Sequence, residues 1–265
     1  MDFNKYRGKM NTLNVYTGRN SQIGQYLPDN LHYVSYDIED ELTWGFLQDC
    51  RNLFLVVPKI PRALDHCKEF VYAAKIAGVK NIVKIGSLGS WRVIHNQIDA
   101  YIRDCGINCI SFDISVLMNN IFTEQYVDGV LLNYRHDTPA PYLDPRVLAL
   151  AIQQAMRREA LLNFNIKATG LSQYSIEDVK RILESNGYPV TCIKTIHNNQ
   201  LHKNAGVSAD QRLMSDINDD YELGIYPKIN TDITRMFGVV HRTLERFVAE
   251  DSQYFLNLQA GDKNL

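Results

Sequence analysis

The stretch VYTGRNSQIGQYLPDNLHYVSYDIED, residues Val15–Asp40, decides the fold of this chain. A short apolar strand ends at Gly18, a helix is expected from Ser21 to Leu27, and proline and asparagine residues stop it. The segment Leu31–Ile38 alternates and is rich in Tyr and Val, which is typical of a second strand. A strand, a glycine turn, a helix start and a strand ending in acids indicate the opening of a nucleotide-binding βαβ unit.

The same alternation of strands and helices continues beyond this stretch. Apolar runs typical of buried parallel strands occur at Asn52–Val57, Asn81–Ile85 and Ile107–Ile114. Helical patterns lie before and between them, at Glu39–Cys50, Pro61–Gly78 and Trp91–Cys105. This order predicts an α/β fold with a Rossmann-like parallel sheet and right-handed crossovers.

The rhythm changes after about residue 125, where the predicted strands and helices become less regular. Short strands are expected at Gly129–Asn133 and Pro141–Tyr142, followed by a helix over Pro145–Arg158. We therefore expect a Rossmann-like domain over residues 1–128 and a smaller α+β substrate-binding lobe over residues 129–265, from which the chain can return to the sheet.

Composition excludes several classes of protein. The net charge of −2 gives no overall attraction for nucleic acid or anionic membranes, so direct nucleic-acid binding is not expected. The chain starts without an apolar signal segment and has no run of about 18 apolar residues. Its five cysteines form no CxxC pair and offer no metal site. We expect a cytoplasmic protein with a small-molecule substrate; a homo-oligomer is compatible with the sequence.

A series of motifs carries a family resemblance. They are TGRNSQIG, YDIED, NLFLVVP, AGVKNIVKIGSLGS, HNQIDAYIRDCGIN, FDISVLMNN, PYLDPRVLALAI, FNIKATGLSQYSIEDVKRILESNGYPV and MFGVVHRTLERFV. In order and spacing they resemble the NmrA-like branch of the atypical short-chain dehydrogenases/reductases, over nearly the whole chain. The resemblance implies an NADP- or NAD-binding Rossmann domain and a substrate cleft between that domain and the C-terminal lobe. Members include reductases of quinones, imines and enones, and redox-sensing regulators that bind the cofactor without catalysis.

The glycine turn departs from the pattern that a dinucleotide requires. The first glycine permits the bend, the second admits the pyrophosphate and the third allows close packing. Gly18 and Gly24 remain, whereas Ser21 stands in the middle, where its hydroxyl can cap the helix or donate to an anion. Arg19 and Asn20 can add charge and hydrogen bonds to a phosphate. The expected cofactor-binding positions are Gly18, Arg19, Asn20, Ser21, Gly24, Asp37 and Pro58.

The acid of this region has two interpretations. By spacing, Asp37 follows Gly18 at about the distance of the acid that holds the cofactor ribose. By resemblance, YDIED corresponds to the end of the family's third strand, so that one strand–helix unit is missing. We favour the deletion, which predicts a shortened sheet. In either case the adenosine end of the pocket is incomplete, and cofactor binding is in question.

Candidate catalytic residues lie in the loops after the central strands. Short-chain reductases usually carry a Tyr and a Lys four residues apart, where this chain has Trp91 and His95. His95 typically titrates near neutral pH and can act as acid or base, although a histidine at a helix start is more often structural. Ser87 follows a central strand, and Asp113 replaces the family's arginine. We therefore name His95, Asp113 and Ser87 as catalytic candidates, with no metal.

The motif FDISVLMNN and the start of the following helix supply the substrate candidates, which are Met118, Asn119, Asn120 and Trp91. Three functions remain open. The first is an enzyme that performs a non-redox step, such as cyclisation, isomerisation or dehydration, with a degenerate NAD(P) site. The second is an NAD(P)H-dependent reductase of a quinone, imine or enone. The third is a non-catalytic redox sensor or regulatory binding protein, because the Tyr–Lys pair is missing.

Overall fold

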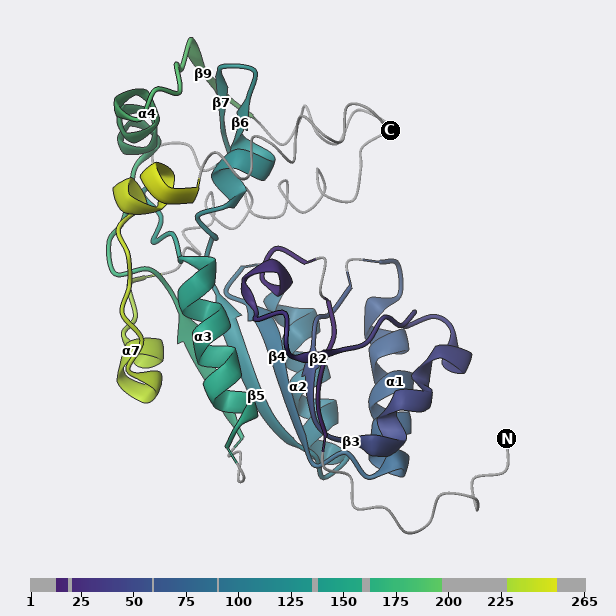
Figure 1. Ribbon diagram of the computed structural model, residues 1–265. Helices are drawn as coiled ribbons and strands as arrows, with labels where there is room; N and C mark the ends of the chain where they lie inside the picture. Colours follow the sequence, from purple (N-terminus) through teal and green to yellow (C-terminus); the bar gives the residue numbers. More distant parts are fainter. Residues whose placement is uncertain are drawn as a thin grey trace. The chain divides into compact units, whose positions relative to one another are not determined.

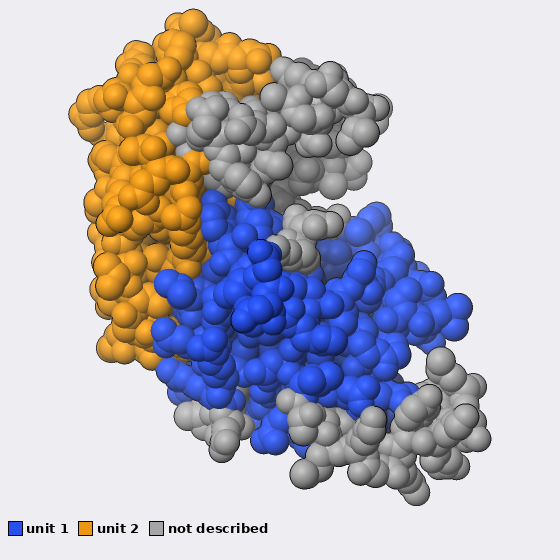
Figure 2. Space-filling model, in the orientation of Figure 1, with its two compact units in different colours: residues 1–87, 92–113, 148–166 blue, residues 88–91, 114–147, 167–265 orange. Residues whose placement is uncertain are grey.

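A computed structural model describes residues 13–18, 21–58, 60–89, 91–134, 138–158, 163–196 and 228–251 of the chain. The chain divides into two compact units (Figure 2). The first unit contains residues 1–87, 92–113 and 148–166, and the second contains residues 88–91, 114–147 and 167–265. The chain thus passes between the units several times, and the domain boundary after residue 128 stays a prediction.

The first unit is built on a parallel sheet of six strands (Figure 1). The order β2-β1-β3-β4-β5-β8 and the parallel pairing of the first four strands confirm the Rossmann-like fold. The strands are β1 (Leu13–Tyr16), β2 (His32–Tyr33), β3 (Cys50–Leu55), β4 (Asn81–Ser87), β5 (Asn108–Ile114) and β8 (Phe164–Ala168).

The sheet is shortened at the β2 edge. β2 lies directly beside β1, whereas the usual order 3-2-1-4-5-6 places one more strand outside it. Among the described residues, no strand of this sheet lies beyond β2, in agreement with the predicted loss of one strand–helix unit. The predicted strand Leu31–Ile38 is confirmed only at His32–Tyr33. The Val34 amide still donates to the Tyr16 carbonyl, at 3.0 Å, but β1 ends at Tyr16 and offers no further partner.

Helices cover both faces of this sheet. On one face lie α1 (Ala63–Ala77), α2 (Arg92–Asp104) and the nine-residue 3-10 helix η3 (Glu41–Asp49), whose apolar side chains share one core with the strands. In Figure 1, α3 (Pro145–Met156), of which residues 148–156 belong to this unit, lies on the opposite side from α2. Gly78 ends α1 with a φ of +90°, a left-handed conformation that favours glycine at the end of a helix. The predicted α-helices around α1 and α2 are confirmed, whereas the predicted helix before β3 is of the 3-10 type.

Four asparagines form a ladder across β1, β3, β4 and β5. Asn52 Nδ2 donates to Asn14 Oδ1 at 2.6 Å, and Asn81 Nδ2 donates to Asn52 Oδ1 at 2.6 Å. Asn108 Nδ2 donates in turn to Asn81 Oδ1 at 3.0 Å. Asn52 and Asn81 are also register partners between β3 and β4. The ladder therefore satisfies two buried amides and favours a single register of the parallel strands.

The second unit holds a sheet of three short strands in the order β6-β7-β9. β6 (Tyr126–Val127) and β7 (Val130–Asn133) form an antiparallel hairpin. Its turn residues, Asp128 and Gly129, have φ angles of +49° and +81°, which an Asp-Gly pair favours. β9 (Cys192–Thr195) pairs with β7 in parallel. The helices of this unit include η4 (Ile121–Gln125), α4 (Ile176–Ser185), α7 (Asp232–Phe237) and residues 244–251.

One prediction for the second unit is wrong. Pro141–Tyr142 forms no strand, because only single bridges pair the flanking backbone, between Leu117 and Leu143 and between Ala140 and Tyr174. In the part of the chain that the structure describes, no helix is long and apolar enough to span a bilayer.

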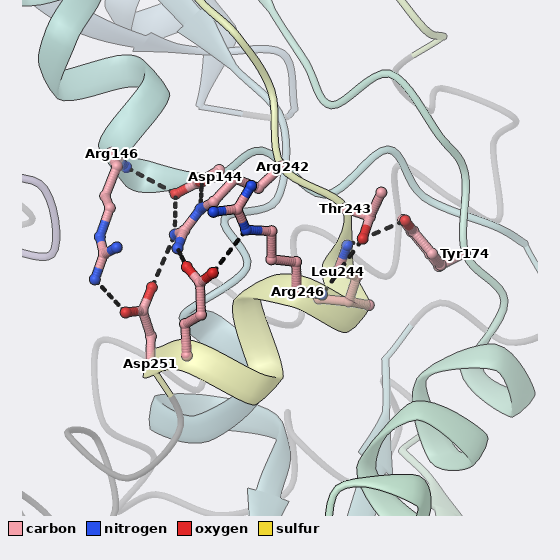
Figure 3. Close-up of polar contacts among 9 residues, drawn as sticks. Asp144, Arg146, Tyr174, Arg242, Thr243, Leu244, Arg246 and Asp251 are labelled. Atoms are coloured by element: carbon pink, nitrogen blue, oxygen red, sulfur yellow. Dashed lines mark hydrogen bonds and ion pairs between the residues drawn. The ribbon is translucent and has the colours of Figure 1, made fainter.

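A largely buried arginine, Arg242, holds the helix of residues 244–251 against the start of α3. Arg242 Nε lies 2.6 Å from Asp144 Oδ2, and its Nη2 lies 2.8 Å from Asp251 Oδ2 (Figure 3). Arg146 pairs with the same Asp251 carboxylate. Because both aspartates are almost fully buried, the two arginines supply the charge compensation that water cannot.

Replacing Asn81 by Leu should lower the free energy of unfolding by about 2–4 kcal/mol. The substitution conserves volume but leaves Asn52 Oδ1 and Asn108 Nδ2 without their partners, at about 1–3 kcal/mol per buried group. Urea denaturation followed by circular dichroism measures the change. Asn96→Leu, at an exposed position of α2, is the control and should change stability by less than about 0.5 kcal/mol. Equal effects of the two substitutions would contradict the ladder's role.

Candidate functional site

The glycine turn after β1 keeps its first glycine for a steric reason. Gly18 has a φ of +68°, and a Cβ at this position would lie 2.6 Å from Cγ2 of Val56. Both conditions exclude other residues. The Ser21 amide donates to the Gly18 carbonyl at 2.9 Å and closes the turn.

The prediction of a helix from Ser21 to Leu27 is wrong. Only a three-residue 3-10 helix, η2 (Gly24–Tyr26), follows the turn. The Ser21 hydroxyl accepts the Gly24 amide at 3.0 Å, so it caps this short turn. Few residues separate Ser21 from Pro28, and a helix of this length is marginal because its first turn is costly to form.

The described residues after β1 differ from a usual dinucleotide site. A pyrophosphate binds where several free amides and the dipole of a longer helix converge, whereas η2 has only three residues. The expected ribose acid, Asp37, lies beyond the end of β2, and its carboxylate accepts the Glu39 amide at 2.9 Å. The Asp37 carbonyl accepts from Trp44 Nε1 at 2.8 Å, so this residue shapes the turn into η3. Arg19 and Asn20 lie outside the described residues.

A buried charge pair joins the sheet to α2. Lys84 on β4 and Asp99 on α2 are 0% and 1% exposed, and Lys84 Nζ lies 2.9 Å from Asp99 Oδ1. The Asp99 carboxylate also accepts from Asn165 Nδ2 at 3.0 Å and from Cys109 Sγ at 3.7 Å. An ammonium in such an interface requires a partner, because an uncompensated buried charge is strongly destabilising. Burial raises the pKa of the Cys109 thiol to about 12, so this cysteine is not a nucleophile.

His95 faces the same lysine, one helical turn before Asp99. Lys84 Nζ and His95 Nδ1 are 3.4 Å apart. An ammonium can only donate, so Nδ1 accepts and the proton of the neutral ring lies on Nε2. Burial and, to a smaller extent, the Lys84 charge lower the pKa of His95 from 6.5 to about 3. At neutral pH His95 is therefore a hydrogen-bond donor, and the expected titration near pH 7 does not hold in this environment.

Asp113 reaches the same interface from β5. Ser111 Oγ donates to Asp113 Oδ1 at 3.1 Å, and Asn165 Nδ2 lies 3.4 Å from Oδ2. Burial raises the pKa of Asp113; the Lys84 charge partly opposes this rise and the Asp99 charge adds to it. A Cβ at Gly86 would overlap the Asp113 carboxylate, so glycine makes room for it. We call Lys84, His95, Asp99, Ser111, Asp113 and Asn165 the polar cluster.

Three further candidate residues lie near the ends of β3, β4 and α2. Ser87 is the last residue of β4, Trp91 directly precedes α2 and Pro58 follows β3; all three are part-exposed. Their proposed roles stay predictions. The structure thus brings His95 and Asp113 together, through Lys84 and Asp99. Among the described residues, no group of three or more His, Cys, Asp and Glu side chains is arranged to hold a metal ion.

The substrate candidates Met118, Asn119 and Asn120 lie in the second unit, just before η4. Met118 is 2% exposed and Asn119 is fully buried. Neither Nδ2 nor Oδ1 of Asn119 has a hydrogen-bond partner. An unpaired buried amide costs about 1–3 kcal/mol, so this arrangement calls for an explanation.

Sequence reasoning missed the centre of the polar cluster. Lys84 interrupts the apolar run NIVKI, and a charge in a strand covered on both faces must have a buried partner. Asp99 lies four residues after His95 and therefore on the same helix face. These two signals were present in the sequence, whereas the contribution of Asn165 from β8 depends on the sheet order and could not be seen there.

Comparison with known proteins places the fold. No family model and no curated protein matches the chain. The Citrobacter sp. triphenylmethane reductase complexed with NADP(H) has a TM-score of 0.69 at 15% identity, covering 89% of this chain and 99% of that chain. The Escherichia coli NADPH-dependent quinone oxidoreductase QOR2, complexed with NADPH, has a TM-score of 0.74 at 16% identity, with 89% and 99% covered. NmrA, a negative transcriptional regulator in complex with NAD, has a TM-score of 0.68 at 11% identity, with 91% and 95% covered.

The sheet and these similarities define a Rossmann-like α/β protein. More specifically, its fold is similar to those of the triphenylmethane reductase, QOR2 and NmrA, in agreement with the predicted resemblance. At 11–16% identity the similarity establishes the fold alone, and the activity has to be argued from the site.

Replacing His95 by Gln should flatten the dependence of stability on acid pH. The unfolded chain binds a proton at His95 below about pH 6.5, whereas the folded chain does so only near pH 3. The stability due to neutral His95 is therefore complete above pH 6.5 and is lost as the pH falls from 6.5 towards 3. Urea midpoints measured across this range should fall more steeply for the wild type than for His95→Gln.

His32→Gln, at an exposed position, is the matched control and should follow the wild-type curve. Superimposable curves for His95→Gln and the wild type would show that this ring is not held neutral.

Proposed function

We propose that this protein is an enzyme that acts on a small organic molecule by a non-redox step, such as isomerisation, cyclisation or dehydration, without a nicotinamide cofactor. One observation carries the proposal: the glycine turn leads into a three-residue 3-10 helix instead of a phosphate-binding helix. The loss of a strand beside β2 supports it, because the ribose end of a dinucleotide site is built there.

The polar cluster supplies chemistry for such a step. His95, with its proton on Nε2, can donate a hydrogen bond to a carbonyl oxygen and stabilise the negative charge that develops when the neighbouring carbon loses a proton. Lys84 fixes this tautomer from the other side of the ring. Asp113, whose pKa is raised by burial, is suited to exchange a proton closer to neutral pH than a solvated aspartate. In this proposal Ser87, the last residue of β4, contacts the substrate; substrate contact by Trp91 and Met118–Asn120 stays a prediction from the sequence.

A reductase is the second candidate. Gly18 keeps the left-handed bend of the dinucleotide turn, and the Citrobacter and E. coli proteins of this fold were crystallised with NADP(H) and NADPH. Under this alternative NADP or NAD binds, and a quinone, imine or enone is reduced. A regulatory protein is the third candidate, because NmrA is a negative transcriptional regulator that binds NAD and this chain lacks the Tyr–Lys pair.

Calorimetric titration of the protein with NADPH and with NADH should give no saturable binding at millimolar concentration. The physical reason is the missing helix, so Ser21→Gly, which restores the middle glycine, should not restore binding. The E. coli quinone oxidoreductase serves as the positive control.

Each outcome of this titration separates the candidates. Micromolar binding of either nucleotide to the wild type would sink the cofactor-independent enzyme and favour the reductase or the regulator. Binding that appears only in Ser21→Gly would mean that the serine, and not the short 3-10 turn, excludes the cofactor.

A further inference from the structure

Asn119 combines full burial with a side chain that forms no hydrogen bond. Asn119 is 0% exposed, and among the described residues neither its donor Nδ2 nor its acceptor Oδ1 has a hydrogen-bond partner. Buried amides in folded proteins almost always have partners, whether protein groups or bound molecules. Unlike the side-chain amides of Asn52 and Asn81, these two atoms of Asn119 have no hydrogen-bond partner among the described residues.

The fold does not need the Asn119 side chain. The Asn119 carbonyl accepts from the Phe122 amide at 3.0 Å, the Thr123 amide at 3.1 Å and the Thr123 hydroxyl at 3.2 Å. The Met118 amide donates to the Leu143 carbonyl at 2.9 Å. The backbone alone therefore fixes the turn, and the carboxamide is left available.

Two features next to Asn119 point to a ligand. The segment η4 is a single π-helical turn, a rare conformation that is frequent at functional sites. Asn120 donates to Glu124 Oε2 at 3.0 Å, which orients its amide, and its buried Oδ1 has no partner. Asn120, the next residue along the chain, is part-exposed.

We propose that Asn119 binds a neutral carboxamide-type group of a ligand, either an open-chain amide or a lactam. The ligand N–H donates to Asn119 Oδ1, and the ligand carbonyl accepts from Nδ2, so that both unpaired atoms are satisfied. A carboxylate ligand lacks the donor, and its second oxygen would face Asn119 Oδ1, so that two acceptors would repel each other. The inference builds on the proposed function, since it names the group by which the substrate is held.

Titration of the ¹⁵N-labelled protein with 2-pyrrolidinone tests the proposal, because this lactam carries adjacent N–H and C=O groups. The Asn119 side-chain resonances should shift and saturate. N-methyl-2-pyrrolidinone lacks the donor and should bind at least about tenfold more weakly, which corresponds to one lost hydrogen bond. Acetate should leave these resonances unchanged.

Asn119→Leu should abolish binding of 2-pyrrolidinone while leaving the melting temperature unchanged or raised, because it removes an unsatisfied buried amide. The matched control, Asn81→Leu, removes an amide with partners and should lower the melting temperature. Equal binding of the two lactams, which needs only the wild type, would overturn the proposal. So would a loss of melting temperature in Asn119→Leu as large as in the control.

The test is independent of the proposed reaction, because it measures binding and no turnover. If NADPH binds at micromolar concentration while the lactam still shifts Asn119, the cofactor-independent enzyme fails and the amide site stands. If neither binds, the amide site fails and the cofactor-independent enzyme is untouched.

Discussion

The ammonium group of Lys84, fully buried on the central strand β4, constrains much of the first unit. It requires a carboxylate, which Asp99 supplies from α2, and that carboxylate requires further donors, which come from β8 and β5. The same face must then hold the Asp113 carboxylate, and only a glycine at position 86 leaves the space. One charge in a strand therefore determines residue types on a helix and on three strands.

The buried pair of Lys84 and Asp99 orients neighbouring side chains more than it stabilises the fold. Apolar side chains of similar volume often replace a buried ion pair without loss of stability, because desolvation offsets most of the attraction. What apolar residues could not supply is the direction of the His95 ring, whose Nδ1 is engaged by Lys84. Since the pKa of His95 is lowered to about 3, the ring keeps one tautomer across the physiological range. The cluster is thus better suited to present a fixed donor than to stabilise the fold.

The sequence predicted the parallel sheet and the helices α1 and α2, because periodicity is a local signal. The shortened edge was predicted from the family resemblance of the motif YDIED. It failed at the glycine turn, where the motif TGRNSQIG predicts a helix that Pro28 leaves no room to build. It found His95 and Asp113 as single residues but missed Lys84 and Asp99, which connect them. The asparagine ladder was missed as well, because residues 14, 52, 81 and 108 meet only once the strands are in register.

The buried side chains of Asn52, Asn81 and Asn119 differ in their hydrogen bonding, and this difference bears on function. In the first unit the buried amides of Asn52 and Asn81 and the charges of Lys84 and Asp99 all have protein partners, so these groups hold the scaffold and orient His95. In the second unit Asn119 has a bonded backbone and an unbonded side chain. A leucine of similar size would avoid the cost of this unsatisfied amide, and a bound ligand would offset that cost. Asn119 is therefore a position at which a bound ligand would stabilise the protein.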